Sequence, residues 1–523
     1  MAADNFPLAP RTVSSNAPRL AVNTGTCGRA LGSEALLQAL REAAAGRFDV
    51  VEAGCDGACY EAPSVSLLAP GQNRRRFAGV APDGAARLLA DLSSDGQDPP
   101  SSPFFAAQAR SLLAHCGLVD PTDIDSSLSL GAYRPLWRAL SSMTPEEVID
   151  EVEASDLRGR GGAYFPTGRK WRSARGFPTP RYVVVNAEEG EPGVFKDRHL
   201  MEGDPHLLLE GILIASYALG AERAFLFING LAAGSRRRVE LALEQARERR
   251  LVGEHILGTE FSLEIEVRSG AGGYVLGEES VLLNGIEGWR SVPRTRPPFP
   301  TEAGLWASPT VINNVETLCN VPILLRDGAE AYRDGASPNG TGTKLVSLSG
   351  AVKRPGLVEI SMGTSLRDVI LGIGGGAPDG RTITGVLAGG PSGGFLSIDS
   401  LDTPARPGPL ASSGAVLGSG GIVVLDDSLP IVEVVRHLTE YNRNESCGKC
   451  TPCREGTDQM LEILTRAASS EAGAGDLDRL LFLGEVATSA SLCGLGQMAA
   501  NPITSAVDQF GEQMRTVFQG SGK

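Results

Sequence analysis

The sequence has little that suits a membrane or a nucleic acid. Its most apolar stretch, residues 207–228, contains Glu210, Glu222 and Arg223, whereas a spanning helix needs about 20 consecutive apolar residues. The net charge is −14, and no stripe of lysine and arginine with interleaved aromatic residues occurs. The N-terminus lacks a basic start followed by an apolar block, so no signal peptide is predicted. We expect a cytoplasmic protein that contacts neither a membrane nor nucleic acid.

Common catalytic motifs are also scarce. The five histidines form no triad-like or metal-ligand pattern. The main glycine-rich loop, 159–171 (GRGGAYFPTGRKW), matches neither G-x-G-x-x-G nor a Walker A loop. No internal repeat of 20–50 residues is visible. With 42% hydrophobic and 21% charged residues over 523 positions, the chain has a globular composition and roughly three or four domains.

Glycine and cysteine, in contrast, are informative. The 65 glycines gather in a few loops, which favours close approach of the backbone to ligands. Nine cysteines in a reducing compartment are better candidates for metal ligation than for disulfides.

Composition and periodicity predict a multi-domain α/β protein. Arg181–Asn186 (RYVVVN) and Ala224–Ile228 read as buried strands, and Phe261–Val267 alternates as a half-covered strand. Helical patterns lie between them, as in an α/β sandwich. The predicted parts are a disordered N-terminus (1–19), a compact α/β segment (20–92), a linker (93–104), a large α/β domain (105–343), a small β-rich module (344–430) and a helical region (431–523).

The strongest local signal is SCGKCTPCREG, which places Cys447, Cys450 and Cys453 in a C-x2-C-x2-C run, with Cys493 further along. Three thiolates at this spacing can each bind one iron of a cubane, and the distant cysteine can bind the fourth. The alternative is a structural zinc site, which usually takes two separated C-x2-C pairs. This pattern favours one 4Fe–4S cluster.

Several loops of the α/β region carry polar side chains that suit a nucleotide. NAEEGEPGVFKDR (186–198) directly follows a predicted strand, and the segments 270–280 and 308–318 come later in the chain. Ligands of α/β sheets bind beyond the carboxyl ends of strands. Glycines in 159–162, with Arg160 and Lys170, could hold an anion. The alternative for any single glutamate is an ordinary surface turn.

Together these motifs resemble the NADH-binding, FMN-containing subunits of respiratory complex I and of NAD-linked hydrogenases and formate dehydrogenases, over about residues 120–515. The resemblance implies a Rossmann-like FMN domain, a ubiquitin-like module of the SLBB type and a helical bundle with one 4Fe–4S cluster. It implies FMN contacts from Gly159, Arg160, Gly161, Gly162, Lys170, Asn186, Glu188, Gly277, Asn313 and Asn314. It implies NAD(H) contacts from Phe165, Glu191, Tyr274, Glu278, Glu279, Arg296 and Phe299.

The sequence departs from this family at a few points. Glu188 stands where the family usually has aspartate, and Leu276 replaces the usual cysteine before the GEE motif. Arg296 stands where relatives often carry lysine. The first two changes leave the implied flavin site intact.

The segment 20–92 resembles the thioredoxin-like 2Fe–2S domain of a partner subunit, with Cys27, Cys55 and Cys59 as its cysteines. A 2Fe–2S cluster needs four ligands, and Asn23 stands where a relative would carry another cysteine. A docking domain without a cluster is the favoured interpretation. A cluster with an unusual fourth ligand is the alternative.

The resemblance implies an oxidoreductase subunit that exchanges hydride between NAD(H) and FMN and single electrons with the cluster. The fused front segment, with no ferredoxin cysteines after Cys493, looks most like the beta subunit of a soluble molybdenum formate dehydrogenase. Hydrogenase or complex I subunits are the alternatives, as is a flavin-free relay or scaffold. Implied partners are a thioredoxin-like 2Fe–2S subunit and a large molybdenum or other catalytic iron–sulfur subunit. Acidic residues near the ribose favour NAD over NADP.

Overall fold

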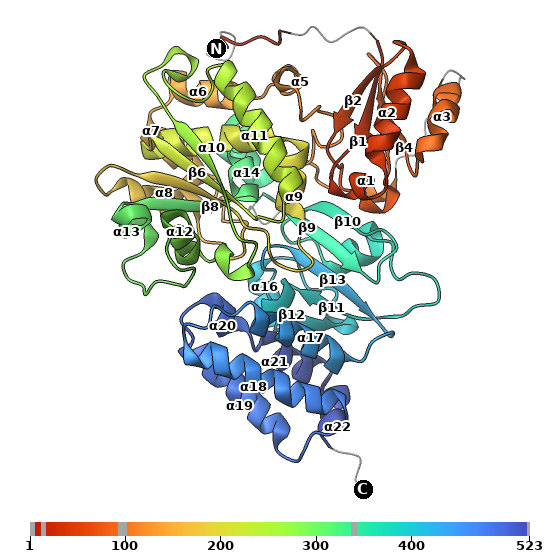
Figure 1. The fold of residues 1–523 in the computed structure, drawn as a ribbon, viewed down its shortest axis with the longest axis vertical. Helices are drawn as coiled ribbons and strands as arrows, with labels where there is room; N and C mark the ends of the chain where they lie inside the picture. The colour runs from red at the N-terminus through yellow and green to blue at the C-terminus, as the bar shows by residue number, and fades with distance from the viewer. Residues whose placement is uncertain (1–5, 12–16, 93–101, 336–341, 520–523) are drawn as a thin grey trace.

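The computed structural model describes residues 6–11, 17–92, 102–335 and 342–519. Within these ranges the chain forms three sheets and a separate helical bundle, arranged along one long axis (Figure 1). The N-terminal unit and the large α/β domain lie at one end, the β-rich module lies in the middle, and the helical domain lies at the other end. The predicted multi-domain α/β class is confirmed. No helix in the described ranges is long and apolar enough to cross a membrane.

The N-terminal unit is a four-stranded mixed sheet with strand order β2-β1-β3-β4. Strand β1 pairs in parallel with β2 and antiparallel with β3. Its elements are β1 (Arg19–Asn23), α1 (Thr26–Ala30), α2 (Ser33–Ala44), β2 (Asp49–Ala53), η2 (Cys59–Glu61), β3 (Val65–Leu68), β4 (Arg75–Phe77), η3 (Pro82–Gly84) and α3 (Ala85–Leu92). Leu36, Leu37 and Leu40 of α2 are buried at the i, i+1, i+4 spacing of a helix face.

The large α/β domain has a parallel sheet with strand order β7-β6-β5-β8. Valines 183–185 in β5 are fully buried because helices cover both faces of a parallel sheet. The strands are β5 (Tyr182–Ala187), β6 (Arg223–Ile228), β7 (Glu264–Ser269) and β8 (Thr310–Asn314). The main helices are α5 (Ile124–Ser129), α6 (Arg134–Ser142), α7 (Pro145–Ala154), α8 (Thr167–Arg175), α9 (Lys196–Gly203), α10 (Pro205–Leu219), α11 (Ala233–Glu248), α12 (Glu279–Glu287) and α14 (Val315–Asp327).

Shorter elements complete this domain. They are α4 (Pro103–Ala106), η4 (Ile256–Gly258), η5 (Tyr274–Gly277), α13 (Pro300–Ala303), η6 (Leu305–Ala307) and α15 (Ala329–Gly335). Segment η5 lies between the carboxyl end of the sheet and the helical domain and contacts both.

The β-rich module is a five-stranded sheet with order β10-β9-β13-β11-β12. Its elements are β9 (Thr343–Gly350), β10 (Gly356–Ser361), η7 (Asp368–Ile373), β11 (Ile383–Ala388), η8 (Gly390–Ser392), β12 (Gly394–Ser397), η9 (Ile398–Ser400), α16 (Pro407–Ser412) and β13 (Gly421–Asp426). The helical domain consists of α17 (Ile431–Asn444), α18 (Thr451–Ala468), α19 (Asp476–Ala490), α20 (Gly494–Met498), α21 (Asn501–Gln509) and α22 (Gly511–Phe518).

Two local expectations differ from the structure. Strand β7 begins at Glu264 and not at Phe261, although Leu263 and Ile265 are buried as the alternation predicts. Residues 1–5, 12–16 and 93–101 of the predicted tail and linker lie outside the described residues. Within the predicted disordered tail, however, Phe6 and Leu8 pack against the α/β core, and the Ala9 carbonyl accepts a hydrogen bond from Arg249 at 2.7 Å. Apolar burial therefore orders part of that tail.

Candidate functional site

Two asparagines meet at the carboxyl ends of neighbouring parallel strands. Asn186, near the end of β5, lies opposite Asn314 of β8 in the strand register. The Asn314 amide donates to the backbone carbonyl of Asn186 at 3.3 Å and to Asp197 at 2.6 Å. The Asn186 amide donates to the carbonyl of Gly277 at 2.8 Å. The structure thus brings three segments that sequence analysis singled out to one edge of the sheet, where α/β proteins bind ligands.

A buried lysine that sequence analysis missed holds Asn314 in place. The Lys196 ammonium, fully buried, donates to Asn314 at 2.9 Å and to Asp197 at 2.7 Å, and lies 3.1 Å from Glu316. Burial lowers the pKa of Lys196, but the charges of Asp197 and Glu316 outweigh it and raise the pKa overall. Lys196 therefore stays charged and fixes the asparagine side chain.

The glycine-rich loop lies against Asn314. A Cβ atom on Gly161 would stand 3.0 Å from the Asn314 Cβ, so a side chain there would crowd the strand end. Gly162 has a φ of +122°, a conformation that favours glycine. The Arg160 side chain is buried and donates to the carbonyls of Thr343 and Arg158. Its charge therefore lies inside the protein, and the loop offers a ligand mainly backbone.

Lys170 and Asn313 have different surroundings. The Lys170 ammonium is partly exposed and donates to Glu279 at 2.5 Å and to the Ile312 carbonyl at 3.0 Å. Lys170 thus lies beside the end of β8 and remains available to an anion. Asn313 is buried and accepts a hydrogen bond from the Trp171 indole at 2.9 Å. The structure gives Asn313 a partner inside the protein, in helix α8.

Glu188 and Glu191, in the loop after β5, each keep one buried carboxylate oxygen without a hydrogen-bond partner. The other oxygen of Glu188 accepts from Asn229 at 2.6 Å, and that of Glu191 accepts from Ser419 at 2.5 Å. Burial, assisted by Glu445, raises the pKa of Glu188 to about 7. Burial also raises the pKa of Glu191 to about 7. Unpartnered buried oxygens are costly, which indicates that a ligand completes them.

Two of the predicted NAD(H) residues, Glu278 and Glu279, lie at the start of α12, where Glu279 pairs with Lys170. Glu278 caps α12 by accepting from the amides of Ser280 and Val281 at 2.9 and 3.0 Å, and it pairs with Arg296. Phe165 and Phe299 are 49% and 51% exposed. Such exposed aromatic faces near polar loops suit stacking on a base.

The four cysteines of the C-terminal motif converge next to η5. Cys450 and Cys493 are the residues directly before α18 and α20, and Cys453 lies in the first turn of α18. Cys450, Cys453 and Cys493 pack in one cluster with Tyr274 and Val275. Ser446, the residue before Cys447, has its hydroxyl 3.2 Å from the Cys453 sulfur, so the segment with the fourth thiol also lies close by.

Four cysteine thiols gathered at one place are the donor set of a 4Fe–4S cluster. Among the described residues, no three of these four cysteines belong to a group whose donor atoms all lie within 4.8 Å of one another. Cysteines that bind different irons of a cubane are held farther apart than ligands of one ion. The residue types and their packing beside η5 therefore fit a 4Fe–4S cluster, and the described residues show no preformed single-ion site at this motif.

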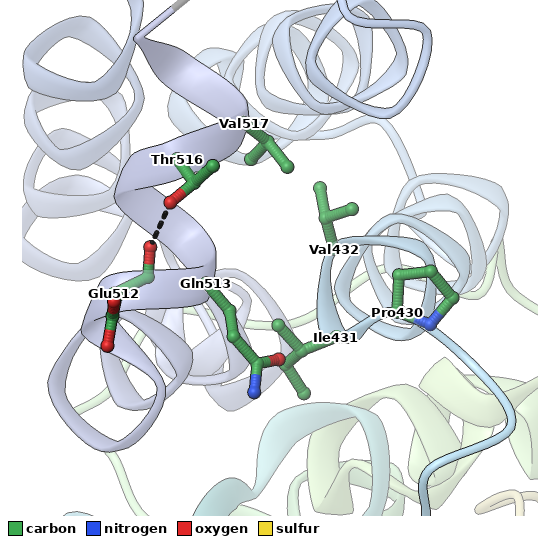
Figure 2. A pocket seen from close by; sticks show the side chains of 7 residues that line it. All are labelled: Pro430, Ile431, Val432, Glu512, Gln513, Thr516 and Val517. Atoms are coloured by element: carbon green, nitrogen blue, oxygen red, sulfur yellow. Dashed lines mark hydrogen bonds between the residues drawn. The ribbon is translucent and has the colours of Figure 1, made fainter.

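A hollow in the helical domain lies apart from these groups. Figure 2 shows it between the start of α17 and helix α22, with lining residues Pro430, Ile431, Val432, Glu512, Gln513, Thr516 and Val517. Its lining contains neither cysteine nor histidine and none of the predicted site residues. The candidate site is therefore the strand-end region, and not this hollow.

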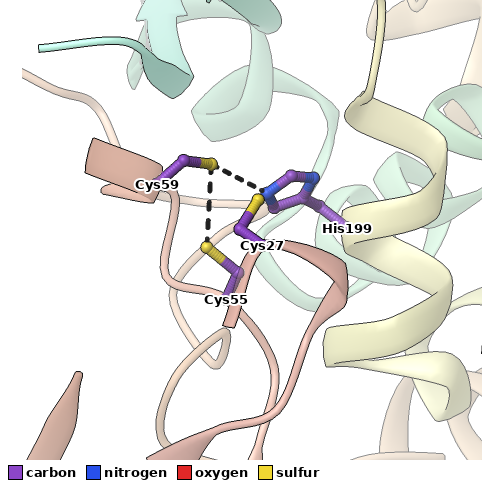
Figure 3. A group of neighbouring side chains, drawn as sticks. All are labelled: Cys27, Cys55, Cys59 and His199. Carbon is purple, nitrogen blue, oxygen red and sulfur yellow. Dashed lines mark hydrogen bonds between the residues drawn. The ribbon is translucent and has the colours of Figure 1, made fainter. Parts of the chain in front are cut away.

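The N-terminal cysteines form a second group, shown in Figure 3. Cys27, Cys55 and Cys59 come together with His199 of α9, and their donor atoms all lie within 4.8 Å of one another. The expectation that no histidine occupies a metal-ligand arrangement is therefore wrong. No local pattern in the sequence indicates this group, because His199 lies 140 positions from Cys59.

Comparison with known proteins identifies three of the domains. Residues 152–323 match the model of the Nuo51 FMN-binding domain, 345–396 match the SLBB domain, and 433–517 match the NADH-ubiquinone oxidoreductase-F iron-sulfur binding region. The chain is 44% identical over 381 residues to an F-type subunit of the NADH-quinone oxidoreductase of Rhizobium meliloti, covering 73% of this chain and 90% of that protein. The chain belongs to the 51 kDa family of NADH-binding flavin and iron–sulfur subunits.

Other members of the 51 kDa family belong to hydrogenases. The NADP-reducing hydrogenase subunit HndC of Solidesulfovibrio fructosivorans is 44% identical over 407 residues, which cover 78% of this chain and 83% of that protein. A crystal structure of an NAD+-reducing NiFe hydrogenase in the H2-reduced state aligns with a TM-score of 0.70 at 30% identity. That alignment covers 97% of this chain and 85% of the hydrogenase chain. It therefore includes nearly all of the N-terminal unit.

The residues at the strand ends fit the FMN of this family. Backbone crowding at Gly161, the unpartnered oxygen of Glu188, the second N–H of the Asn186 amide and the Lys170 ammonium offer the close backbone approach, acceptor, donor and charge that a flavin mononucleotide needs. The resemblance to the NADH-binding, FMN and 4Fe–4S family, with NADH as substrate, is confirmed.

Proposed function

We propose that this chain exchanges a hydride between NAD(H) and FMN, and exchanges single electrons with the 4Fe–4S cluster, as one subunit of a larger redox complex. The observation that carries the proposal is the double role of η5. The Gly277 carbonyl accepts the Asn186 amide at the strand end, while Tyr274 and Val275, at the start of the same segment, pack on the cysteines. One short segment thus joins the flavin region and the cluster region.

Bound FMN supplies the conversion between two-electron hydride chemistry and one-electron transfer. The chain's own part is to position both partners. Lys170 and the glycine loop would bind the phosphate end, and Asn186, held by the Asn314 amide, would orient the ring edge. The exposed rings of Phe165 and Phe299 would stack on the adenine, and the Glu278–Arg296 pair would border the ribose. Hydride exchange between a nicotinamide and a bound flavin would require no general acid or base from the chain.

We propose NAD(H) as the preferred nucleotide and the cytoplasm as the compartment. The support is the adjacent carboxylates Glu278 and Glu279 at the start of α12, because carboxylates beside a ribose repel a 2′-phosphate. All nine cysteines are free, which is consistent with a reducing compartment.

For the ultimate electron donor we propose formate, oxidised by a large molybdenum subunit and relayed through a thioredoxin-like 2Fe–2S subunit. The support is an N-terminal unit with three cysteines in place of four. Hydrogen is the second candidate, because the hydrogenase structure aligns over 97% of this chain.

The first experiment uses the full chain purified without oxygen. We expect a flavin spectrum with an iron–sulfur shoulder, and we expect NADH to bleach it. A brown protein that lacks flavin after FMN is added back, and that NADH leaves unchanged, would support the relay or scaffold alternative. The complex isolated with its partner subunits is then supplied with NAD+ and either formate or hydrogen. NADH formed only from hydrogen would contradict the formate proposal and leave the diaphorase proposal intact.

A further inference from the structure

A compact group of three cysteines and one histidine lies between the N-terminal unit and the large α/β domain, which is the FMN domain (Figure 3). Cys27 lies in α1, Cys55 follows β2, and Cys59 begins η2. His199 extends from α9 of the FMN domain. Cys55 and His199 are buried, and Cys27 and Cys59 are half-buried. Four metal-ligating side chains from two domains therefore point at one enclosed position.

The separations between donor atoms match one tetrahedral ion. The Cys55 and Cys59 sulfurs are 3.9 Å apart, and the Cys59 sulfur is 3.5 Å from Nε2 of His199. A tetrahedral zinc with Zn–S bonds of about 2.3 Å and a Zn–N bond of about 2.05 Å would place two sulfurs about 3.8 Å apart, and a sulfur and nitrogen about 3.6 Å apart. Both distances agree with that geometry, and the remaining separations are all within 4.8 Å.

The same spacing disfavours a 2Fe–2S cluster. In such a cluster the four ligands are divided between two irons, so ligands of different irons stand farther apart than ligands of one ion. Here all four donor atoms lie within 4.8 Å of one another. Three cysteines and one histidine are also a recurrent ligand set of structural zinc sites.

The surroundings of His199 prepare it as a ligand. Nδ1 of His199 lies 2.5 Å from the carbonyl of Phe195, one helical turn earlier. A carbonyl can only accept, so Nδ1 carries the hydrogen and Nε2 presents its lone pair toward Cys59. Hydrogen bonding of the remote nitrogen is the usual way in which proteins fix metal-binding histidines.

We propose that Cys27, Cys55, Cys59 and His199 bind one zinc ion that fastens the N-terminal unit to helix α9. The three thiols release their protons to solvent when the ion binds. All four positions are filled by protein, so the site is structural and leaves no position for a substrate.

The zinc would act on a helix that also serves the flavin region. Lys196 and Asp197, in the first turn of α9, hold Asn314, and His199 lies in the same turn. The N-terminal unit also packs directly on this helix, because a Cβ on Gly54 would lie 2.1 Å from the Gly203 Cα. Zinc therefore fixes the position of α9, and α9 in turn holds the asparagine at the strand end.

The test is the metal content of the full chain, purified without added metal. We expect one zinc beside four irons per chain, and we expect cobalt(II) substitution to give the absorption of a tetrahedral thiolate site. His199→Gln should bind zinc at least about 100-fold more weakly, since even changes in the groups around a metal ligand cost 10–100-fold. His199→Cys should retain zinc, because four cysteines also bind it.

His437→Gln is the matched control. Nδ1 of His437 lies 2.7 Å from the carbonyl of Glu433, one turn earlier in α17, but its side chain is exposed on the helical domain. Its zinc content should equal that of the wild type. Iron above four per chain with the electron spin resonance of a second cluster would overturn the proposal, as would zinc that survives His199→Gln. If His199→Gln does not accumulate, a wild-type protein without the cobalt–thiolate absorption would overturn it equally.

Discussion

Two regions of the molecule contain buried carboxylates, but they differ in whether each carboxylate oxygen has a hydrogen-bond partner. At the boundary between the N-terminal unit and α9, both oxygens of Glu202 accept hydrogen bonds from Thr26 at 2.7 Å, and Arg29 lies 3.3 Å away. At the strand ends, Glu188 and Glu191 each keep a buried oxygen with no partner. Burial of Glu202 costs little free energy, because protein donors replace the water that its oxygens lose. Glu188 and Glu191 each keep the desolvation cost of one oxygen until a ligand supplies a partner.

This difference separates a structural boundary from a binding site. The boundary around Glu202 and the Cys27–His199 group has its polar side chains directed at one another. The strand-end loops keep acceptors, a partly exposed lysine and two exposed aromatic rings for something outside the chain. Changes in the loops should therefore alter ligand binding, and changes at the boundary should alter how firmly the N-terminal unit is held.

The largest effect is expected from Lys170→Glu. The substitution removes the cation proposed to bind the FMN phosphate and places a carboxylate beside Glu279. A charge-assisted hydrogen bond is worth about 1.5–3 kcal/mol, so with the added repulsion we expect FMN affinity to fall about 100-fold. Flavin content after gel filtration, followed by titration with FMN, measures the change.

Lys353→Glu is the control for that substitution. Lys353 forms a 2.7 Å pair with Asp379, whose side chain is 95% exposed, and it lies in the β-rich module. Its FMN content should stay at one per chain. Stoichiometric FMN in the Lys170→Glu protein would show that the loop 159–171 has been assigned wrongly.

The predictable parts of the site are those encoded by near neighbours in the chain. The spacing of Cys447, Cys450 and Cys453 is local, so it predicts a cluster without knowledge of the fold. The apolar run of β5, followed at once by polar residues, predicts a strand that ends at a site. In both cases the partners lie within a few residues of one another.

Other features depend on contacts that only the fold creates. His199 joins cysteines far away in the chain, 140 residues in the case of Cys59, and Lys196 meets Asn314 across 118 residues. Neither residue stands in a metal-binding or capping pattern of its own. Arg160 shows the converse, because a basic residue in a glycine-rich loop suggests a phosphate ligand, yet its side chain turns inward to backbone carbonyls.

A smaller effect is expected at the boundary, from Glu202→Gln. The amide keeps one acceptor but turns an NH2 group toward donors and loses the charge opposite Arg29. We expect local opening of the N-terminal unit to become easier by about 2 kcal/mol, a roughly 30-fold loss of amide-exchange protection in β1 and β2. Hydrogen exchange measured by mass spectrometry reports this change directly.

Glu240→Gln provides the comparison for Glu202. Glu240 pairs with Arg236 at 2.7 Å on the exposed face of α11, and such surface pairs contribute about 0.5 kcal/mol or less. Protection of β1 and β2 should be unchanged in this variant. If the amides of β1 and β2 were protected as well in Glu202→Gln as in wild type, the boundary would not depend on its buried carboxylate.

The smallest effect concerns the pH dependence of the flavin-free protein. Burial raises the pKa of Glu188 to about 7 from an ordinary value of 4.5. The folded protein therefore keeps a proton that the unfolded chain releases, and stability falls as pH rises from 4.5 to 7 and levels off above. Glu188→Gln removes this loss of stability. The melting temperature of the variant minus that of wild type should therefore be larger at pH 8 than at pH 5, and the corresponding change in the free energy of unfolding should be about 1–2 kcal/mol.

Glu485→Gln, at an exposed position of α19, should show no such change between the two pH values. Bound FMN should also reduce the difference between wild type and Glu188→Gln, if the flavin completes the unpartnered oxygen. A Glu188→Gln protein whose relative stability is the same at pH 5 and pH 8 would mean that Glu188 is solvated or paired in the flavin-free protein. The contrast between the closed boundary and the open strand ends would then rest on Glu191 alone.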